Sequence, residues 1–293
     1  MSLTKGKVAI AAMSFVFVFI SSILSPAFGA HYRFGVFPGS DPAKIEKAMG
    51  YLADCMNRVG DDDISIVVTR DYGELLSRML EGSLDFAFIN TVNYVELKSK
   101  MPGVRYMVTL MKRTDAKNIA EGYYYSYIVS LRNRGFSSVQ DLKDGSFAFV
   151  DRSSSSGYVY PRYTLDKMGI VPDDFFKKVY YLSRHDRVVK ALLAGSVDGG
   201  AISDGMYSKA VEMYGDMFSV LAVSDPIPLD LMVASDRVPE TKVEEYVRAL
   251  LRLSSNSDFR IEMEALFGWY VEGFCVLDDS VYDKAREVLD FEG

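Results

Sequence analysis

The sequence is poor in the side chains that bind transition metals. It has only two histidines, two cysteines and one tryptophan in 293 residues. It contains no Cys-x-x-Cys, no pair of histidines at ligand spacing and no acidic calcium loop. We therefore expect no metal site, and we expect no cofactor. In an oxidising compartment Cys55 and Cys275 could pair, or both could stay free as buried thiols, and the sequence leaves these alternatives open.

Long apolar runs are also scarce. The only run that approaches the length of a membrane span is Val8–Leu24, which follows two lysines and precedes the small residues of Ala27-Phe28-Gly29. This pattern predicts that residues 1–29 are a secretory signal peptide, cleaved before Ala30, and that the protein reaches the periplasm. The alternative is an uncleaved membrane anchor. A lipid anchor is not indicated, because no cysteine lies at the expected cleavage point.

The chain has fewer basic than acidic residues. The chain has 33 basic and 40 acidic residues, and loss of Lys5 and Lys7 with the signal peptide leaves 31 minus 40, a net charge of −9. Nucleic-acid binding needs a basic face, so this charge balance argues against a nucleic-acid partner.

From residue 30 on, β-favouring runs alternate with helix-forming segments, which predicts an α/β fold with largely parallel sheets. We expect a first lobe of residues 30–123 and 228–293, and a second lobe of residues 124–227. Two crossings between lobes imply a hinge and a cleft, where ligands preferentially bind. The expected strands are His31–Phe37, Ile64–Val68, Leu84–Ile89, Val104–Met111, Tyr123–Leu131, Phe147–Val150, Val179–Leu182, Val197–Ile202 and Leu231–Ala234. Three helices, at about residues 238–253, 258–266 and 280–289, are expected to end the chain.

One stretch in the second lobe is of special interest. The strand Phe147–Val150 is followed by four serines, Ser153–Ser156, by Gly157 and by a helical pattern to Met168. A strand that turns into a helix through small hydroxyl residues places free backbone N–H groups at the positive end of the helix dipole. Gly157 is expected to let a ligand approach the backbone closely. The stretch therefore predicts an anion site, and a flexible serine linker is the alternative.

Further segments join this stretch in a pattern of motifs. They are Thr69–Tyr72, Gly82–Phe88, Asn93-Tyr94, Phe149–Asp151 with Ser154–Gly157, His185-Asp186 and Asp198–Asp204. In this order they resemble the periplasmic binding proteins of phosphonate, phosphite and phosphate ABC transporters. The resemblance implies a two-lobed periplasmic binding protein fold of the type II-like class, with each lobe a mainly parallel sheet flanked by helices. The sequence departs from the family's pattern at Arg152, at Ser155 and at Asn90-Thr91-Val92, where proline, threonine and Gly-Pro are usual.

The resemblance also implies a set of ligand-binding residues. Ser154, Ser155 and Ser156 would hold phosphoryl oxygens through hydroxyl and backbone N–H groups, with an ordinary helix cap as the alternative. Tyr72 and Tyr94, each near a helix start, would donate to the ligand or close over its substituent. Packing is the alternative for any one of the 19 tyrosines.

Two further residues complete the expected site. His185, just before a helix, would donate from its imidazole to a phosphoryl oxygen, or else cap the helix at the surface. Asp204, at a helix start after a strand, would accept from the P–OH of a monoprotonated ligand and so reject sulfate, or meet the ammonium group of an aminoalkylphosphonate. A plain helix cap is the alternative for Asp204.

Together these features predict a solute-binding protein, not an enzyme, that captures a small phosphorus oxyanion and presents it to a membrane ABC permease. We expect a monomer. A ligand-sensing role for a separate membrane receptor or kinase would use the same fold and is the main alternative. A hydrolase with Ser156, His185 and Asp204 as a triad is a weaker alternative, because Gly-x-Ser-x-Gly is absent around the serines.

Overall fold

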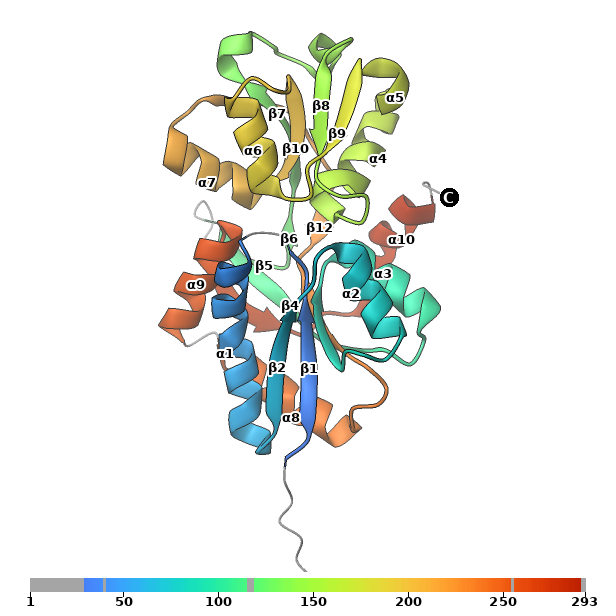
Figure 1. Cartoon of the computed structure of the whole chain (residues 1–293), viewed down its shortest axis with the longest axis vertical. Coiled ribbons are helices and arrows are strands. Elements are labelled where there is room, and N and C mark those ends of the chain that lie inside the picture. Colours follow the sequence, from blue (N-terminus) through green and yellow to red (C-terminus); the bar gives the residue numbers. More distant parts are fainter. Residues whose placement is uncertain (1–28, 39–40, 115–118, 254–255, 291–293) are drawn as a thin grey trace, which may run out of the picture.

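The computed structural model describes residues 29–38, 41–114, 119–253 and 256–290. The described chain forms two lobes that are stacked along the long axis of the molecule (Figure 1). Apart from Gly29, the expected signal peptide lies outside the described residues. Among the helices of the described segments, none has the length and apolarity that a membrane span requires.

The larger lobe is built on a seven-stranded sheet with the order β14-β4-β13-β3-β1-β2, and β5 pairs with β4. The helices α1, α8 and α9 pack together on one side of this sheet, and α2, α3 and α10 lie on the other (Figure 1). Its strands are β1 (His31–Val36), β2 (Asp63–Val68), β3 (Phe86–Ile89), β4 (Arg105–Thr114), β5 (Ile119–Glu121), β13 (Leu231–Ala234) and β14 (Tyr270–Cys275). Its helices are α1 (Pro42–Gly60), α2 (Tyr72–Leu80), α3 (Thr91–Lys100), α8 (Glu240–Leu250), α9 (Ser257–Phe267) and α10 (Asp283–Asp290).

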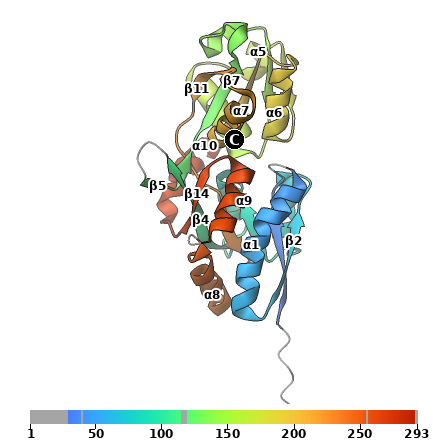
Figure 2. The same ribbon diagram turned by 90° about the vertical axis from the view of Figure 1, so that its left-hand side faces the viewer.

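The smaller lobe has a five-stranded sheet with the order β11-β7-β10-β8-β9. Its strands are β7 (Ser126–Leu131), β8 (Ser146–Phe149), β9 (Lys178–Tyr181), β10 (Gly199–Ser203) and β11 (Phe218–Val223). Its helices are α4 (Tyr160–Lys167), α5 (Pro172–Phe175), α6 (His185–Leu193) and α7 (Asp204–Tyr214). Figure 2 shows α7 of this lobe above α9 of the larger lobe. The two helices meet where the lobes touch, because Lys209 of α7 donates to the Ala265 carbonyl of α9 at 2.7 Å.

Helix starts follow the capping residues in the sequence. Asp71 accepts a hydrogen bond from the Glu74 amide at 2.7 Å and so begins α2 directly after the end of β2. Asn90 accepts from the Asn93 amide at 2.8 Å and begins α3 directly after β3. Such caps satisfy amides that the helix leaves unpaired. Both helices therefore start at the edge of the sheet that faces the smaller lobe.

The two lobes are joined by a short antiparallel pair, β6 (Tyr123–Tyr124) and β12 (Ile227–Pro228). The sequence predicts one strand over Tyr123–Leu131, but the structure has two, β6 and β7, with Tyr125 between them. The Tyr125 carbonyl accepts a hydrogen bond from the Asp204 amide at 2.9 Å instead of continuing a ladder. The lobe boundaries expected from the sequence, after residues 123 and 227, fall within this pair.

The sheets differ from the expected mainly parallel arrangement. In the larger lobe only β1 pairs in parallel fashion, with β2 and β3, and the pairs that involve β13, β4, β14 and β5 are antiparallel. In the smaller lobe β8 has two parallel neighbours and β7 two antiparallel ones. The strands β13 and β7, which enter their sheets from the other lobe, run opposite to both of their neighbours. The sequence reading also missed β14, a six-residue strand interrupted by Gly273.

The two cysteines are both free in the structure, and both are half-buried. Burial raises the pKa of the Cys55 and Cys275 thiols. Each therefore stays a neutral thiol at neutral pH. Of the two alternatives from the sequence, a disulfide or two free thiols, the structure has the free thiols.

Candidate functional site

The serine-rich stretch forms the turn between β8 and α4, as the sequence predicts. A π-helical turn, Ser155–Val159, leads directly into α4, and Ser154 caps it by accepting from the Gly157 amide at 3.1 Å. The amides of Ser155 and Ser156 have no hydrogen-bond partner among the described residues. Two free amides at the positive end of a helix are suited to an anion.

Gly157 has a different role from the one expected. A Cβ atom at this position would lie 2.4 Å from Cβ of Val150, far inside van der Waals contact. The glycine therefore lets the turn pack against the end of its own strand. It does not provide a close approach for a ligand.

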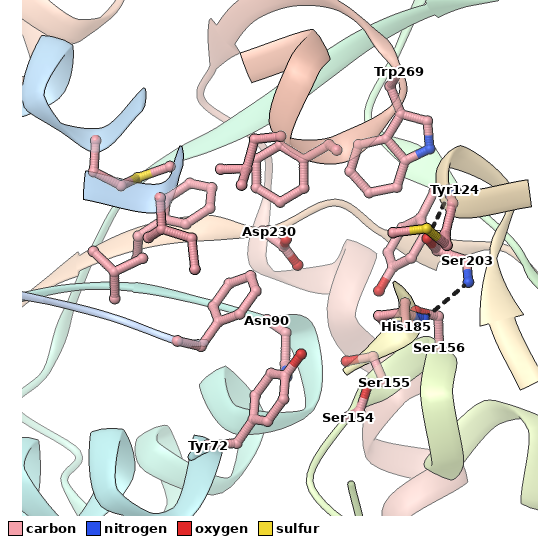
Figure 3. Close-up of a pocket in the computed structure, with 18 residues that line it drawn as sticks. Tyr72, Asn90, Tyr124, Ser154, Ser155, Ser156, His185, Ser203, Asp230 and Trp269 are labelled. Carbon is pink, nitrogen blue, oxygen red and sulfur yellow. Dashed lines mark hydrogen bonds between the residues drawn. The ribbon is translucent and has the colours of Figure 1, made fainter. Parts of the chain in front are cut away.

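The serine turn borders a pocket between the lobes (Figure 3). The pocket holds a cavity of about 50 Å³, counted as the space open to the centre of a water molecule. No lysine or arginine is among the described residues that line it. Five of the seven residues expected from the sequence come together here: Tyr72, Ser154, Ser155, Ser156 and His185. The other lining residues are Val36, Phe37, Ile45, Met49, Phe88, Asn90, Tyr124, Ser203, Met206, Asp230, Leu266, Phe267 and Trp269.

The serine turn also contacts the larger lobe, through one hydroxyl and one backbone carbonyl. Ser155 Oγ accepts a hydrogen bond from the Val92 amide at 3.2 Å, and the Ser153 carbonyl accepts from the Asn90 side chain at 3.0 Å. Both donors lie at the start of α3. With its oxygen engaged in this way, the Ser155 hydroxyl keeps its own proton available for an acceptor in the pocket.

Two phenols stand on either side of the serine turn. Burial raises the pKa of the Tyr72 phenol. Burial likewise raises the pKa of the Tyr124 phenol well above its ordinary value. Both hydroxyls therefore stay protonated at neutral pH and can act as donors. The sequence did not identify Tyr124 as a pocket residue, because nothing distinguishes it from the other tyrosines in the run 123–127.

His185 is fixed in one tautomer. Its Nδ1 accepts a hydrogen bond from the Ser203 amide at 3.3 Å, so the proton of the neutral ring is on Nε2. Burial lowers the pKa of His185 to about 4, which keeps the ring neutral at pH 7. Nε2–H has no partner among the described residues. This geometry also excludes the triad considered above, since Nδ1 is an acceptor and does not donate to Asp204.

Asp230 is a pocket residue that the sequence reading missed. It lies immediately before β13, on the segment that returns from the smaller lobe. Its carboxyl group is buried and has no hydrogen-bond partner among the described residues. Burial raises the pKa of Asp230 to about 8, so the group is mostly protonated at pH 7. An aspartate between Pro228 and a buried strand was the only signal in the sequence, and it does not say which way the side chain points.

Asp204, expected to face the ligand, does not line the pocket. Its carboxylate accepts from Lys112 Nζ at 2.6 Å and from Trp269 Nε1 at 2.7 Å. Both partners belong to the larger lobe, so this buried ion pair links the lobes. The backbones are also close here, because a Cβ atom at Gly205 would lie 2.2 Å from the Phe267 carbonyl oxygen. The structure therefore replaces the expected acceptor for P–OH with a contact between lobes.

Tyr94 also lies outside the pocket. Its phenol donates to Asp279 Oδ1 at 2.8 Å, and its ring packs against Tyr282 with centroids 4.8 Å apart. It therefore fastens α3 to the C-terminal segment of the larger lobe. The residue of this helix start that lines the pocket is Asn90, the cap itself.

Comparisons with known proteins agree with this architecture. Residues 34–282 match the model of a family described as the periplasmic substrate-binding protein of phosphonate ABC transporters. The chain is 21% identical to the phosphate-import protein PhnD of Mycolicibacterium smegmatis, over 87% of this chain and 84% of that protein.

Solved structures show the same fold. A binding protein component of an ABC phosphonate transporter from Pseudomonas aeruginosa is similar with a TM-score of 0.75 and 17% identity, covering 90% of this chain and 86% of that one. PhnD1 from Prochlorococcus marinus, solved with methylphosphonate, gives a TM-score of 0.74 and 17% identity, covering 88% of this chain and 96% of that one. The protein belongs to the family of periplasmic substrate-binding proteins of phosphonate ABC transporters.

Proposed function

We propose that this protein captures a small phosphorus oxyanion (a phosphonate, phosphite or phosphate) between its lobes for delivery to the permease of an ABC transporter. The observation that carries this proposal is the set of unused donors in the pocket. The amides of Ser155 and Ser156, the Ser155 hydroxyl and Nε2–H of His185 all lack an acceptor among the described residues. Neutral donors of this kind suit an anion whose charge is spread over several oxygens. Relatives named for phosphate import or solved with methylphosphonate support this chemistry.

The proposed binding residues follow the geometry. Ser154, Ser155, Ser156, Tyr72 and His185 keep the role expected from the sequence. We add Tyr124, Asn90 and Asp230, which line the same pocket, and we assign Tyr94 and Asp204 to positions outside the ligand's contacts.

Asp230 gives this site its proton dependence. As a neutral acid it donates its hydroxyl to an oxygen of the ligand, and as a carboxylate it accepts from a P–OH. Either way Asp230 and the ligand share one proton. Burial of two negative charges with no proton between them is unfavourable, so binding requires that proton.

We propose that the two lobes close on the ligand by bending at β6 and β12, with residues 30–123 and 228–293 in one lobe and 124–227 in the other. The exported form begins at Ala30, after loss of residues 1–29, and acts as a monomer. Scattering in solution should show a smaller radius of gyration with saturating ligand than without it. An unchanged radius would count against closure. Nothing among the described residues favours the sensor alternative.

Titration calorimetry tests the function directly. The purified exported protein is titrated with inorganic phosphate, phosphite, methylphosphonate, 2-aminoethylphosphonate and sulfate, and the five affinities are compared. We expect at least one phosphorus ligand to bind and sulfate to bind more weakly. Failure of all four phosphorus ligands, in calorimetry and in thermal-shift measurements, would overturn the proposal.

A further inference from the structure

The chain enters the larger lobe at the end that lies away from the smaller lobe, where β1 and β2 begin (Figure 1). The Ala30 backbone is held there on both sides. Its carbonyl accepts from the Asp63 amide at 2.9 Å, next to the first pair of the parallel β1–β2 ladder. Its nitrogen donates to Asp62 Oδ1 at 2.8 Å. The nitrogen atom of the expected cleavage bond therefore contacts a carboxylate directly.

Asp62 is a buried carboxylate whose two oxygens have different partners. Its side chain is only 2% exposed. Oδ2 accepts from Lys242 Nζ at 2.8 Å and from the Tyr246 phenol, and both of these donors lie on α8. These contacts fix the carboxylate and leave Oδ1 for the Ala30 nitrogen. An acceptor that is already held in place loses little rotamer freedom when it binds a cation.

The surroundings of Asp62 contain more acidic than basic groups. They combine the acidic run at the start of β2 with groups from α8 and β1. The groups are the carboxyl groups of Asp61, Asp62, Asp63 and Glu245, the phenols of Tyr32 and Tyr246, the imidazole of His31, which contacts Asp63, and the ammonium group of Lys242. In this set one lysine stands against four carboxyl groups, so a further positive charge at Ala30 is favourable.

We propose that Asp62 is the binding site for the α-ammonium group that cleavage before Ala30 creates. The proposal rests on the export proposed above and not on the identity of the ligand. Hydrolysis by a signal peptidase breaks the bond between the Gly29 carbonyl carbon and the Ala30 nitrogen. Water supplies a hydroxyl group to Gly29 and a proton to the nitrogen, and the new carboxylic acid gives its proton to the amine.

Cleavage changes the donor that Asp62 meets. Before cleavage Ala30 has an uncharged amide with one N–H, whereas the ammonium group has three N–H donors and a full charge. A charge-assisted hydrogen bond is roughly twice as strong as a neutral one. The larger lobe therefore reaches its full stability only after the leader has been removed.

The ion pair gives the stability of the exported protein a defined pH dependence. A free α-amino group has a pKa of about 8, and a carboxylate partner raises that pKa in the folded protein. The stabilisation is complete below about pH 8 and is lost as the pH rises through the raised pKa. Each unit by which the pKa is raised corresponds to a factor of about ten in the folding equilibrium constant.

Urea unfolding of two proteins tests the proposal, one that begins at Ala30 and one that begins at Gly29. Both have a charged N-terminus, but in the second the nitrogen on Asp62 is a neutral amide. We expect the folding equilibrium constant of the Ala30 form, divided by that of the Gly29 form, to fall about tenfold between about pH 6.5 and about pH 9.5. A ratio that does not change with pH overturns the proposal. N-terminal sequencing of the exported protein should return Ala30, and another first residue would overturn it too.

Two variants identify the partner of the ammonium group. Asp62→Asn keeps an acceptor but removes the charge, so the pH dependence of the ratio should vanish. Asp63→Asn is the matched control, because Asp63 is the next acid in the chain, is 77% exposed and contacts His31. Its ratio should stay within about twofold of the wild-type ratio at each pH. Dependence that survives in Asp62→Asn, or is lost equally in Asp63→Asn, contradicts the assignment.

Two further readouts keep the outcome unambiguous. If Asp62→Asn does not fold, the wild-type pH profile decides alone, because an uncharged cause of the difference would not titrate with an amine. Methylphosphonate affinity should be equal in the Ala30 and Gly29 forms, because none of these residues lines the pocket. Failure of ligand capture would therefore count against the proposed function and leave the role of Asp62 standing.

Discussion

Two aspartates, Asp204 and Asp230, are buried where the lobes meet, and the structure uses them in opposite ways. Asp204 is 8% exposed and its carboxylate is shared by Lys112, Trp269 and the Gly205 amide. Asp230 is 4% exposed and has no partner for its carboxyl group among the described residues. The first is a charge neutralised by the opposite lobe. The second is an acid that burial keeps mostly neutral and that lines the pocket between the lobes.

The comparison shows that burial alone does not identify a ligand-binding carboxyl group. The Asp204 carboxylate has both oxygens engaged, one by a cation at 2.6 Å and the other by Trp269 and the Gly205 amide, and these partners hold it away from the pocket. A buried acid with no partner keeps both a donor and an acceptor free. The difference depends on which residues of the larger lobe lie opposite each aspartate.

The largest effect is expected from Asp204→Ala. The substitution leaves Lys112 buried and unpaired when the lobes are together, at a cost of about 3–5 kcal/mol, whereas separated lobes let water reach it. The closed form is therefore destabilised, and the affinity for every ligand falls by one common factor. Calorimetry with methylphosphonate and n-propylphosphonate checks this prediction.

The matched control for Asp204→Ala is Asp225→Ala. Asp225 lies 3.7 Å from Lys284 in a more exposed ion pair between the lobes, and such pairs contribute only about 0–1 kcal/mol. An equal loss in both variants would contradict the larger contribution expected of the buried pair. A changed ratio between the two ligands in Asp204→Ala would show that Asp204 also contacts the ligand.

A smaller effect, on ligand affinity and not on the contact between lobes, is expected from Asp230→Ala. Removal of a hydrogen bond to a charged ligand costs about 1.5–3 kcal/mol, which weakens methylphosphonate by roughly 10- to 150-fold. The radius of gyration of the ligand-free protein should stay at the wild-type value, because Asp230 makes no contact between lobes. Scattering together with calorimetry checks both parts. Unchanged affinity would remove Asp230 from the site.

The smallest effect is expected from Ser155→Ala. The substitution removes one neutral donor and the acceptor for the Val92 amide at 3.2 Å. The binding free energy of every oxyanion should therefore become less favourable by a similar amount, about 0.5–1.5 kcal/mol. Ser153→Ala is the control, because only the backbone carbonyl of Ser153 contacts Asn90. A loss confined to one ligand would show that Ser155 reads the substituent and not the oxyanion.

The sequence predicted what local rules decide. The helix start at Tyr72 and the strand–turn–helix around Ser154 follow from neighbours within a few residues, and the structure has both. The sequence did not predict what distant segments decide. Asp204 is at a helix start as expected, but Lys112 and Trp269 come from strands and loops 92 and 65 residues away.

Long-range packing explains the other misses too. The pocket rings of Phe37, Phe88 and Phe267 pack on one another although they come from the residue after β1, from β3 and from the end of α9. None of these contacts is visible as a spacing in the chain. Tyr94 and Tyr72 are both near helix starts, yet Tyr94 turns to Asp279 because the C-terminal segment lies against α3. Side-chain direction at a helix start depends on these neighbours.

The most direct measurement is the pH dependence of methylphosphonate affinity in the wild type, Asp230→Asn and Asp204→Asn. As the pH rises through about 8, Asp230 loses its proton in the ligand-free protein and repels the oxyanion, whereas an asparagine remains a donor. The ligand's own ionisation is common to all three proteins. We predict that above pH 8 the wild type and Asp204→Asn lose affinity by about tenfold per pH unit relative to Asp230→Asn. The opposite result, in which Asp204→Asn abolishes this dependence and Asp230→Asn retains it, would contradict the assignment of the two aspartates.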